Sequence, residues 1–93
     1  MTREGAVLTR ARLSRVPRLT VEALAVKAHM SAEQVGVILR GHTRERDEEG
    51  RYKEFRAPAE TVARIAAALD LDDQELAELE QAYPAAARAV PGI

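Results

Sequence analysis

The chain has 93 residues, a formal net charge of −1 and no cysteine. This length fits one domain with a modest core, which we place over residues 1–93. Hydrophobic residues make up 46% and charged residues 31%, a balance typical of globular rather than disordered chains. The absence of cysteine excludes disulfides and thiol catalysis. No apolar run approaches the ~20 residues that span a bilayer, and the first residues lack the apolar region of a signal peptide. We therefore expect a cytoplasmic protein.

The charges are distributed unevenly along the chain. Residues 1–56 carry twelve Lys/Arg and eight Asp/Glu, whereas residues 57–93 carry two and seven. The two parts thus have net charges of +4 and −5. Such asymmetry fits a basic surface for a polyanion such as DNA. An acidic C-terminal part that is simply solvated would explain it equally well.

The first predicted element is a basic helix over residues 4–16, which Pro17 ends. Two competing apolar stripes leave its register open. Its arginines could bind nucleic-acid phosphates or could form a solvated face. They are Arg3, Arg10, Arg12, Arg15 and Arg18.

Residues 20–41 predict two short helices joined by a tight turn. Thr20 is a helix N-cap, and Ser31 with Gln34 three residues later forms a capping box. Gly41 stands where a helix C-cap favours glycine. Helices this short need packing partners, and two of them around a tight turn are typical of a DNA-binding helix-turn-helix.

Residues 42–57 form a long, charged connection. One interpretation is a wing-like hairpin with a turn at 47–50, which would carry cationic side chains to the DNA backbone. The other is a loop that orders on binding. We favour a mostly irregular loop.

The C-terminal part, residues 58–90, predicts further helices. Pro58 suits a helix start, and Asp72 with Glu75 repeats the capping box. Apolar residues then recur at spacings of three and four, although Pro84 interrupts them. This stripe could mediate a homodimer or could pack on the first helix. Its members are Leu76, Leu79, Tyr83, Ala86 and Val90.

The two predicted helices resemble the lambda-repressor-like, Xre-type helix-turn-helix family in the order and spacing of several residues. These residues are Leu24-Ala25, Ser31, Val35, Ile38 and Gly41. Residues 58–76 resemble that family's fourth and fifth helices. The resemblance implies an all-α, compact five-helix DNA-binding domain, here with a long loop or small hairpin after the recognition helix. His29 takes the place of the family's usual turn glycine, so it must accept a positive φ or re-route the turn.

Carried over by position, the resemblance implies that base edges are read by Ala32, Glu33, Gln34, Gly36 and Val37. Gln34 could pair with adenine and Glu33 could accept from cytosine N4. Contacts to the DNA backbone are expected from Thr20, Ser31, Arg40, Arg44, Arg46, Arg51 and Lys53. The partner would be double-stranded DNA, bound by a homodimer on two half-sites.

No catalytic set is present, and neither His29 nor His42 has the spacing of a metal ligand. We expect no enzyme activity, cofactor or metal. Two functions remain open: a small sequence-specific transcriptional regulator without a ligand-binding domain, or a protein-binding module on the same scaffold, antitoxin-like or the partner of a regulator. The second would use an apolar patch of Val21, Val37 and Leu39.

Overall fold

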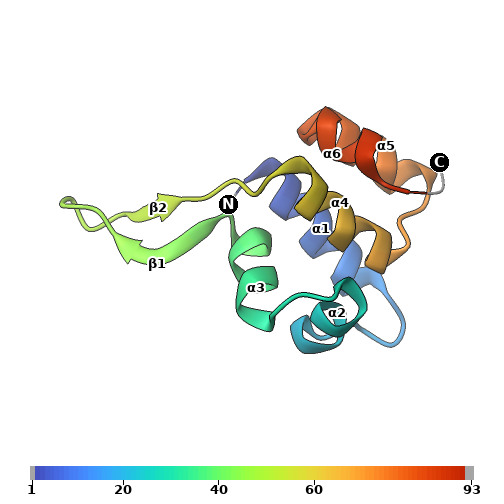
Figure 1. Ribbon diagram of the computed structural model, residues 1–93, viewed down its shortest axis with the longest axis horizontal. Helices are drawn as coiled ribbons and strands as arrows, with labels where there is room; N and C mark the ends of the chain where they lie inside the picture. The colour runs from blue at the N-terminus through green and yellow to red at the C-terminus, as the bar shows by residue number, and fades with distance from the viewer. Residues whose placement is uncertain (1, 92–93) are drawn as a thin grey trace.

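A computed structural model describes residues 2–91, which contain six helices and one two-stranded antiparallel sheet (Figure 1). The mostly helical architecture was expected, but the prediction of five helices is wrong. The elements in chain order are α1 (Arg3–Ser14), α2 (Val21–Ala28), α3 (Ala32–Arg40), β1 (His42–Arg46), β2 (Tyr52–Glu54), α4 (Ala59–Leu69), α5 (Asp73–Ala82) and α6 (Pro84–Ala89).

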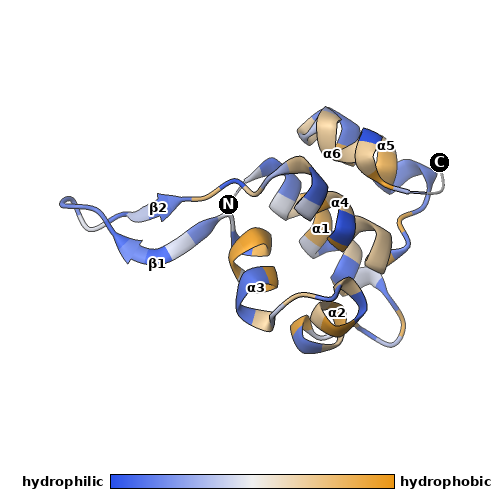
Figure 2. Ribbon diagram, in the orientation of Figure 1, coloured by the Kyte–Doolittle hydropathy of each residue, from blue (hydrophilic) through white to orange (hydrophobic). Residues whose placement is uncertain are grey.

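The core lies where α1 and α4 meet the other helices. Helix α1 packs against α3, α4 and α5, and α4 also packs against α2 and α6. Buried apolar residues of the helices form one cluster at this centre, whereas the two strands are largely hydrophilic (Figure 2). The largest fully buried side chains are Leu8, Leu24, Val35, Val62, Ile65, Leu69 and Leu79. None of the described helices combines the length and the apolar character needed to cross a membrane.

Local side-chain chemistry explains where the helices begin. The Thr20 side chain accepts a hydrogen bond from Ala23 N, which confirms the predicted cap of α2. Both predicted capping boxes are present as well, Ser31 with Gln34 and Asp72 with Glu75. Each satisfies amides of a first helical turn that have no partner within the helix.

Residues 42–57 are not the mostly irregular loop that we favoured, because β1 and β2 form a hairpin that projects from the helical body (Figure 1). Asp47 Oδ1 accepts from the backbone N–H groups of Glu49 and Arg51, and Gly50 has a positive φ of 82°. At the base, Phe55 N donates to Gly41 O at 2.9 Å. The strands are charged because the hairpin stands in solvent on both sides, so no apolar alternation marks it.

The apolar stripe at the C-terminus is not one continuous helix. The chain leaves helical geometry at Tyr83, with φ −155° and ψ 81°, and α6 begins at Pro84. Proline has no N–H to donate to the preceding turn, so it starts a helix more readily than it continues one.

Two glycines set the approach of α1 to α3. A Cβ added at Gly5 would lie 2.6 Å from Leu39 O, so only glycine allows the two backbones to come this close. Gly41 ends α3 with a φ of 77°, which confirms the predicted C-cap, and a Cβ there would lie 2.4 Å from Thr2 N. The start of α1 thus supports the end of α3 and the root of the hairpin.

Candidate nucleic-acid interface

The turn between α2 and α3 is built by three consecutive residues. His29 has a left-handed conformation, with φ 57° and ψ 46°, so this non-glycine residue accepts a positive φ in the turn. Met30 N donates to Ala25 O at 3.0 Å, and Ser31 then caps α3. The turn therefore directs the first residues of α3 outward.

The five expected base-reading residues differ in exposure. Glu33 and Gln34 are exposed, and Ala32 and Val37 are half-buried. Gly36 is buried because Arg40 folds back over it: a Cβ at Gly36 would lie 3.0 Å from Arg40 Nη1. Arg40 must move before Gly36 can approach any ligand.

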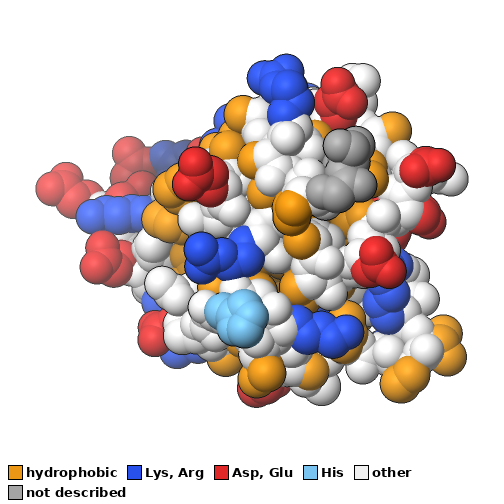
Figure 3. All heavy atoms as spheres, turned by 45° about the vertical axis from the view of Figure 1, so that its right-hand side comes forward, with side chains coloured by type: hydrophobic (Ala, Val, Ile, Leu, Met, Phe, Trp, Pro, Cys, Tyr) orange, Lys and Arg blue, Asp and Glu red, His pale blue; other side chains and the backbone are white. Residues whose placement is uncertain are grey.

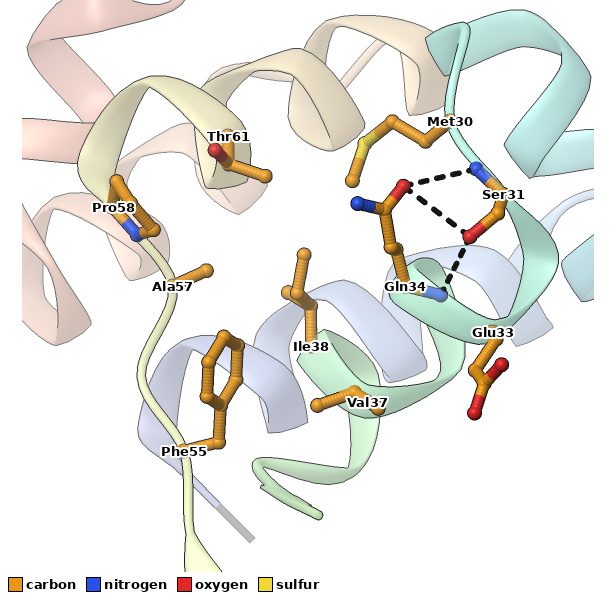
Figure 4. A pocket seen from close by; sticks show the side chains of 10 residues that line it. All are labelled: Met30, Ser31, Glu33, Gln34, Val37, Ile38, Phe55, Ala57, Pro58 and Thr61. Carbon is orange, nitrogen blue, oxygen red and sulfur yellow. Dashed lines mark hydrogen bonds between the residues drawn. The ribbon is translucent and has the colours of Figure 1, made fainter.

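The capping box restricts what Gln34 can offer to a base. Ser31 N and Ser31 Oγ both donate to Gln34 Oε1, each at 3.2 Å. Since a backbone N–H can only donate, the Gln34 carbonyl oxygen must be the atom that faces Ser31. The amide nitrogen points instead into the neighbouring groove (Figure 4). Pairing with adenine needs both ends of the amide, so it would break the box, whereas donation to guanine O6 or N7 or to thymine O4 would not.

A groove of about 360 Å³ runs beside α3. Met30, Val37 and Ile38 line one side, and Phe55, Ala57 and Pro58 of the connection from β2 to α4 line the other (Figure 4). Gln34 and Thr61 add polar groups. The groove is therefore mostly apolar and is continuous with the expected reading surface.

The hairpin has two chemically different sides. On one side the His42 and Tyr52 rings stack with centroids 4.6 Å apart, and the Arg46 guanidinium lies 4.7 Å from the Tyr52 ring centre. Arg46 Nη2 also donates to Tyr52 Oη at 3.0 Å. Elsewhere on the hairpin, Lys53 pairs with Glu45 at 3.6 Å, and Arg51 forms an ion pair with Glu49.

The charges around Tyr52 identify the neighbours of its ring. The hydrogen bond from Arg46 lowers the pKa of the Tyr52 phenol, and the positive charges of Arg46, Arg40 and Arg44 lower it further. Arg46 contacts this exposed ring directly, and the charges of Arg40 and Arg44 act on it without a direct contact. Within residues 2–91, neither Arg44 nor Arg46 forms an ion pair.

Several arginines of the first helix have partners within the chain. Arg10 forms an ion pair with Glu78, and Arg12 Nη1 donates to Leu19 O at 2.9 Å. Arg15 binds both carboxylate oxygens of Glu75, and this fork raises the pKa of the Arg15 guanidinium and lowers the pKa of the Glu75 carboxyl. Arg10 and Arg15 link the first helix to α5, and Arg12 fixes the connection that follows α1.

Arg56 is a structural residue that the sequence did not reveal. Its Nε donates to the buried carboxylate of Glu4 at 3.0 Å, and its Nη2 donates to Ala82 O at 2.9 Å. The guanidinium also lies 3.9 Å from the ring centre of Tyr83. All three partners are distant in sequence, so no local pattern pointed to them.

The proposed dimer stripe is mostly occupied within the monomer. Leu79 and Ala86 are completely buried, and Leu76 and Tyr83 are half-buried. Tyr83 Oη donates to Ala57 O at 2.9 Å. Leu79 and Ala86 therefore belong to the core of the chain, whereas Leu76 and Tyr83 keep part of their surface exposed.

The apolar patch considered for a protein partner also changes. Leu39 is only 5% exposed, and thus belongs to the core. Val21 and Val37 are half-buried. Val37 adjoins Phe55 across the groove (Figure 4), so the apolar surface extends toward the β2–α4 connection rather than toward Leu39.

Other surfaces offer less defined chemistry. On the face shown in Figure 3, cationic, anionic and apolar side chains are interspersed. The described residues hold no group of three His, Cys, Asp or Glu side chains that could bind a metal ion.

Comparisons of this chain with protein-family models, curated proteins and solved structures found no match.

Proposed function

We propose that this protein binds double-stranded DNA in a sequence-specific manner through α3 and acts as a small transcriptional regulator of the lambda-repressor-like type. The observation that carries the proposal is the capped pair α2–α3, whose left-handed turn directs an exposed Glu33 and Gln34 outward. Exposed Arg44 and Arg46 follow α3 on the hairpin and would meet the phosphates beside the groove.

In this proposal α3 lies in the major groove. Gln34 donates from its amide nitrogen while its oxygen keeps the cap of α3, and Glu33 accepts from cytosine N4. Ala32 and Val37 contact thymine methyl groups. Thr20 and Ser31 contribute to phosphate contacts at the two helix starts, since anions are favoured at helix N-termini. Arg40 swings from Gly36 to the backbone.

Two copies would bind two half-sites about one helical turn apart. Light scattering at tens of micromolar, with and without DNA, tests this homodimer. A monomer under both conditions would refute it.

The test of DNA binding is an electrophoretic mobility shift at low and moderate salt, followed by selection of bound sequences from a random pool. Binding should weaken steeply with salt. Gln34→Ala should lose about 1–3 kcal/mol on the selected site and little on random DNA. Val37→Glu should abolish specific binding, because it places a second carboxylate in the groove.

Val16→Glu is the matched control for Val37→Glu. Val16 is 97% exposed in the connection from α1 to α2, so the same substitution there adds the same charge away from α3. Equal loss in both variants would show that charge alone matters and would contradict a reading role for α3.

A protein-binding module is the second candidate, and the apolar groove beside α3 favours it. An amphipathic helix of a partner could place its apolar side against Val37 and Phe55. In that case the effects invert: Val37→Glu destroys a protein complex by burying an unpaired charge, Gln34→Ala has little effect, and the unmodified chain shows no salt-dependent affinity for duplex DNA.

A further inference from the structure

We propose that one side of the hairpin is a preformed clamp for the DNA phosphate backbone, and that its other cations take no part in binding. We call this side the basic face and define it as His42, Arg44, Arg46 and Tyr52; Arg40, the last residue of α3, extends it only after leaving Gly36. The inference rests on the proposed function and deepens it, because it separates the four cations of the hairpin into two that bind DNA and two that do not.

The basic face is organised before any ligand arrives. Tyr52 stacks on His42, and the Arg46 guanidinium lies over the Tyr52 ring while its Nη2 donates to Tyr52 Oη. A guanidinium held against a ring loses less conformational freedom on binding than a free one. Only one of its nitrogens is engaged, so further N–H donors remain for a phosphate.

The remaining cations of the hairpin already have carboxylate partners. Lys53 pairs with Glu45, and Arg51 pairs with Glu49. Asp47 is occupied by the turn, where it accepts two backbone hydrogen bonds. A phosphate would have to displace a carboxylate to reach Arg51 or Lys53, whereas the side chains of Arg44 and Arg46 form no ion pair in the described chain.

The position of the basic face matches a DNA duplex that lies on α3. The hairpin begins directly after the C-cap of α3, and the bond from Phe55 N to Gly41 O fixes its root there. Arg40, at the end of α3, is near enough to Tyr52 for its charge to lower the phenol pKa. The cations therefore continue from the helix onto the hairpin. Glu54, opposite His42 in the strand register, adds one negative charge near the root.

The decisive experiment compares two double variants of the full chain that carry the same net charge. R44A/R46A removes the two cations of the basic face, and R51A/K53A removes the two that are paired. Affinity for a random-sequence duplex is measured by fluorescence anisotropy between 50 and 200 mM salt. Thermal unfolding of each variant should match the unmodified chain, because the hairpin lies outside the core.

Each phosphate contact contributes about 0.9 to the salt slope. Over this fourfold salt range the affinity of the unmodified chain should therefore fall about twelve-fold more than that of R44A/R46A. R51A/K53A should keep the slope of the unmodified chain. Tyr52→Ala, which removes the ring but no cation, should weaken binding about two- to five-fold.

Three results would overturn the inference, and they separate it from the proposed function. Equal loss in the two double variants would show that only net charge matters. No change of slope in either variant, while Val37→Glu still abolishes specific binding, would show that the hairpin does not touch DNA although α3 does. Absence of salt-dependent binding in the unmodified chain would refute the clamp and the proposed function together.

Discussion

Arg15 offers the sharpest test of how this small fold is held together. It follows the last residue of α1, and its Nε and Nη2 donate to Leu69 O at 3.1 and 2.9 Å. Nη1 and Nη2 also bind Glu75 Oε2 and Oε1 at 3.0 and 2.9 Å. One guanidinium thus joins the end of α1 to the end of α4 and the first turn of α5. Arg15→Ala would remove all these bonds at once.

The size of the effect follows from burial and geometry. The Arg15 and Glu75 side chains are 25% and 16% exposed, so their ion pair is less screened than one fully in solvent. Each hydrogen bond to a charged group contributes about 1.5–3 kcal/mol. Because Arg15 and Glu75 are partly exposed, we expect the combined contribution of the Arg15 bonds to be close to that of one strong bond. We expect Arg15→Ala to lower the free energy of unfolding by about 2–3 kcal/mol. For a domain of this size the melting temperature would fall by about 8–24 °C.

Urea and thermal unfolding followed by circular dichroism measure this loss. Arg15→Lys should recover only part of it, because an ammonium cannot span the carboxylate and the Leu69 carbonyl as the planar fork does. Arg18→Ala is the matched control, since Arg18 is exposed and should change stability by less than about 0.5 kcal/mol. If Arg15→Ala is as stable as Arg18→Ala, or if lysine restores full stability, the bridging explanation is wrong.

Three further predictions concern particular positions. Gly5→Ala should destabilise the fold by about 1–3 kcal/mol, because its Cβ would collide with backbone; Gly36→Ala should instead stabilise it by up to about 1 kcal/mol, because only the end of a flexible side chain must shift. Urea titration measures the free energy of unfolding of both alanine variants. Equal changes would contradict the idea that a Cβ at Gly5 meets rigid backbone whereas one at Gly36 meets a flexible side chain. His29→Gly should raise the free energy of unfolding by about 0.5–1 kcal/mol, because the left-handed conformation is costly for a residue with a Cβ. Part of this gain is lost because glycine has a larger conformational entropy in the unfolded chain. A lower melting temperature would show that the imidazole itself stabilises the turn. Glu75→Gln should be less stable than the unmodified chain above pH 4.5, because the ionised Glu75 carboxylate, whose pKa is lowered in the folded state, then contributes its full stabilisation. The difference in the free energy of unfolding between the two proteins should shrink as the pH falls through that lowered pKa. A difference that does not change with pH would refute the ion pair.

The sequence predicted local structure well because capping acts over three or four residues. Thr20, Ser31 and Asp72 cap helices as expected, and Gly41 ends α3. These residues form hydrogen bonds with backbone groups only a few positions away, so their role can be predicted without knowledge of the fold. For His29 the sequence left two possibilities, a positive φ or a re-routed turn, and the structure has the first.

The tertiary partners of individual side chains could not be predicted from the sequence. Arg15 and Arg56 find their carboxylates 60 and 52 residues away, and nothing near either arginine indicates a structural role. The hairpin was one of two interpretations of residues 42–57 but not the favoured one, because solvated strands carry no apolar alternation. Periodicity placed Leu79 and Ala86 on one stripe, but could not decide that the stripe faces the core of the same chain.

Within the candidate site, sequence placed the reading residues on one short helix but not their accessibility. The cover of Arg40 over Gly36 and the engagement of the Gln34 oxygen depend on rotamers rather than on spacing. The division of the hairpin cations into paired and unpaired sets has the same origin. Whether α3 reads DNA stays a prediction for the binding experiments.

The long-range ion pairs have a consequence for the order in which this chain can fold as it is made. Arg10 meets Glu78 after 68 residues and Arg15 meets Glu75 after 60. At roughly 5–20 residues per second, a ribosome needs about 3–12 s to add 60 residues. During this interval α1 has no α5 to pack against. Helices as short as α2 and α3 are marginal alone, so the tertiary structure can be completed only after α5 has been synthesised.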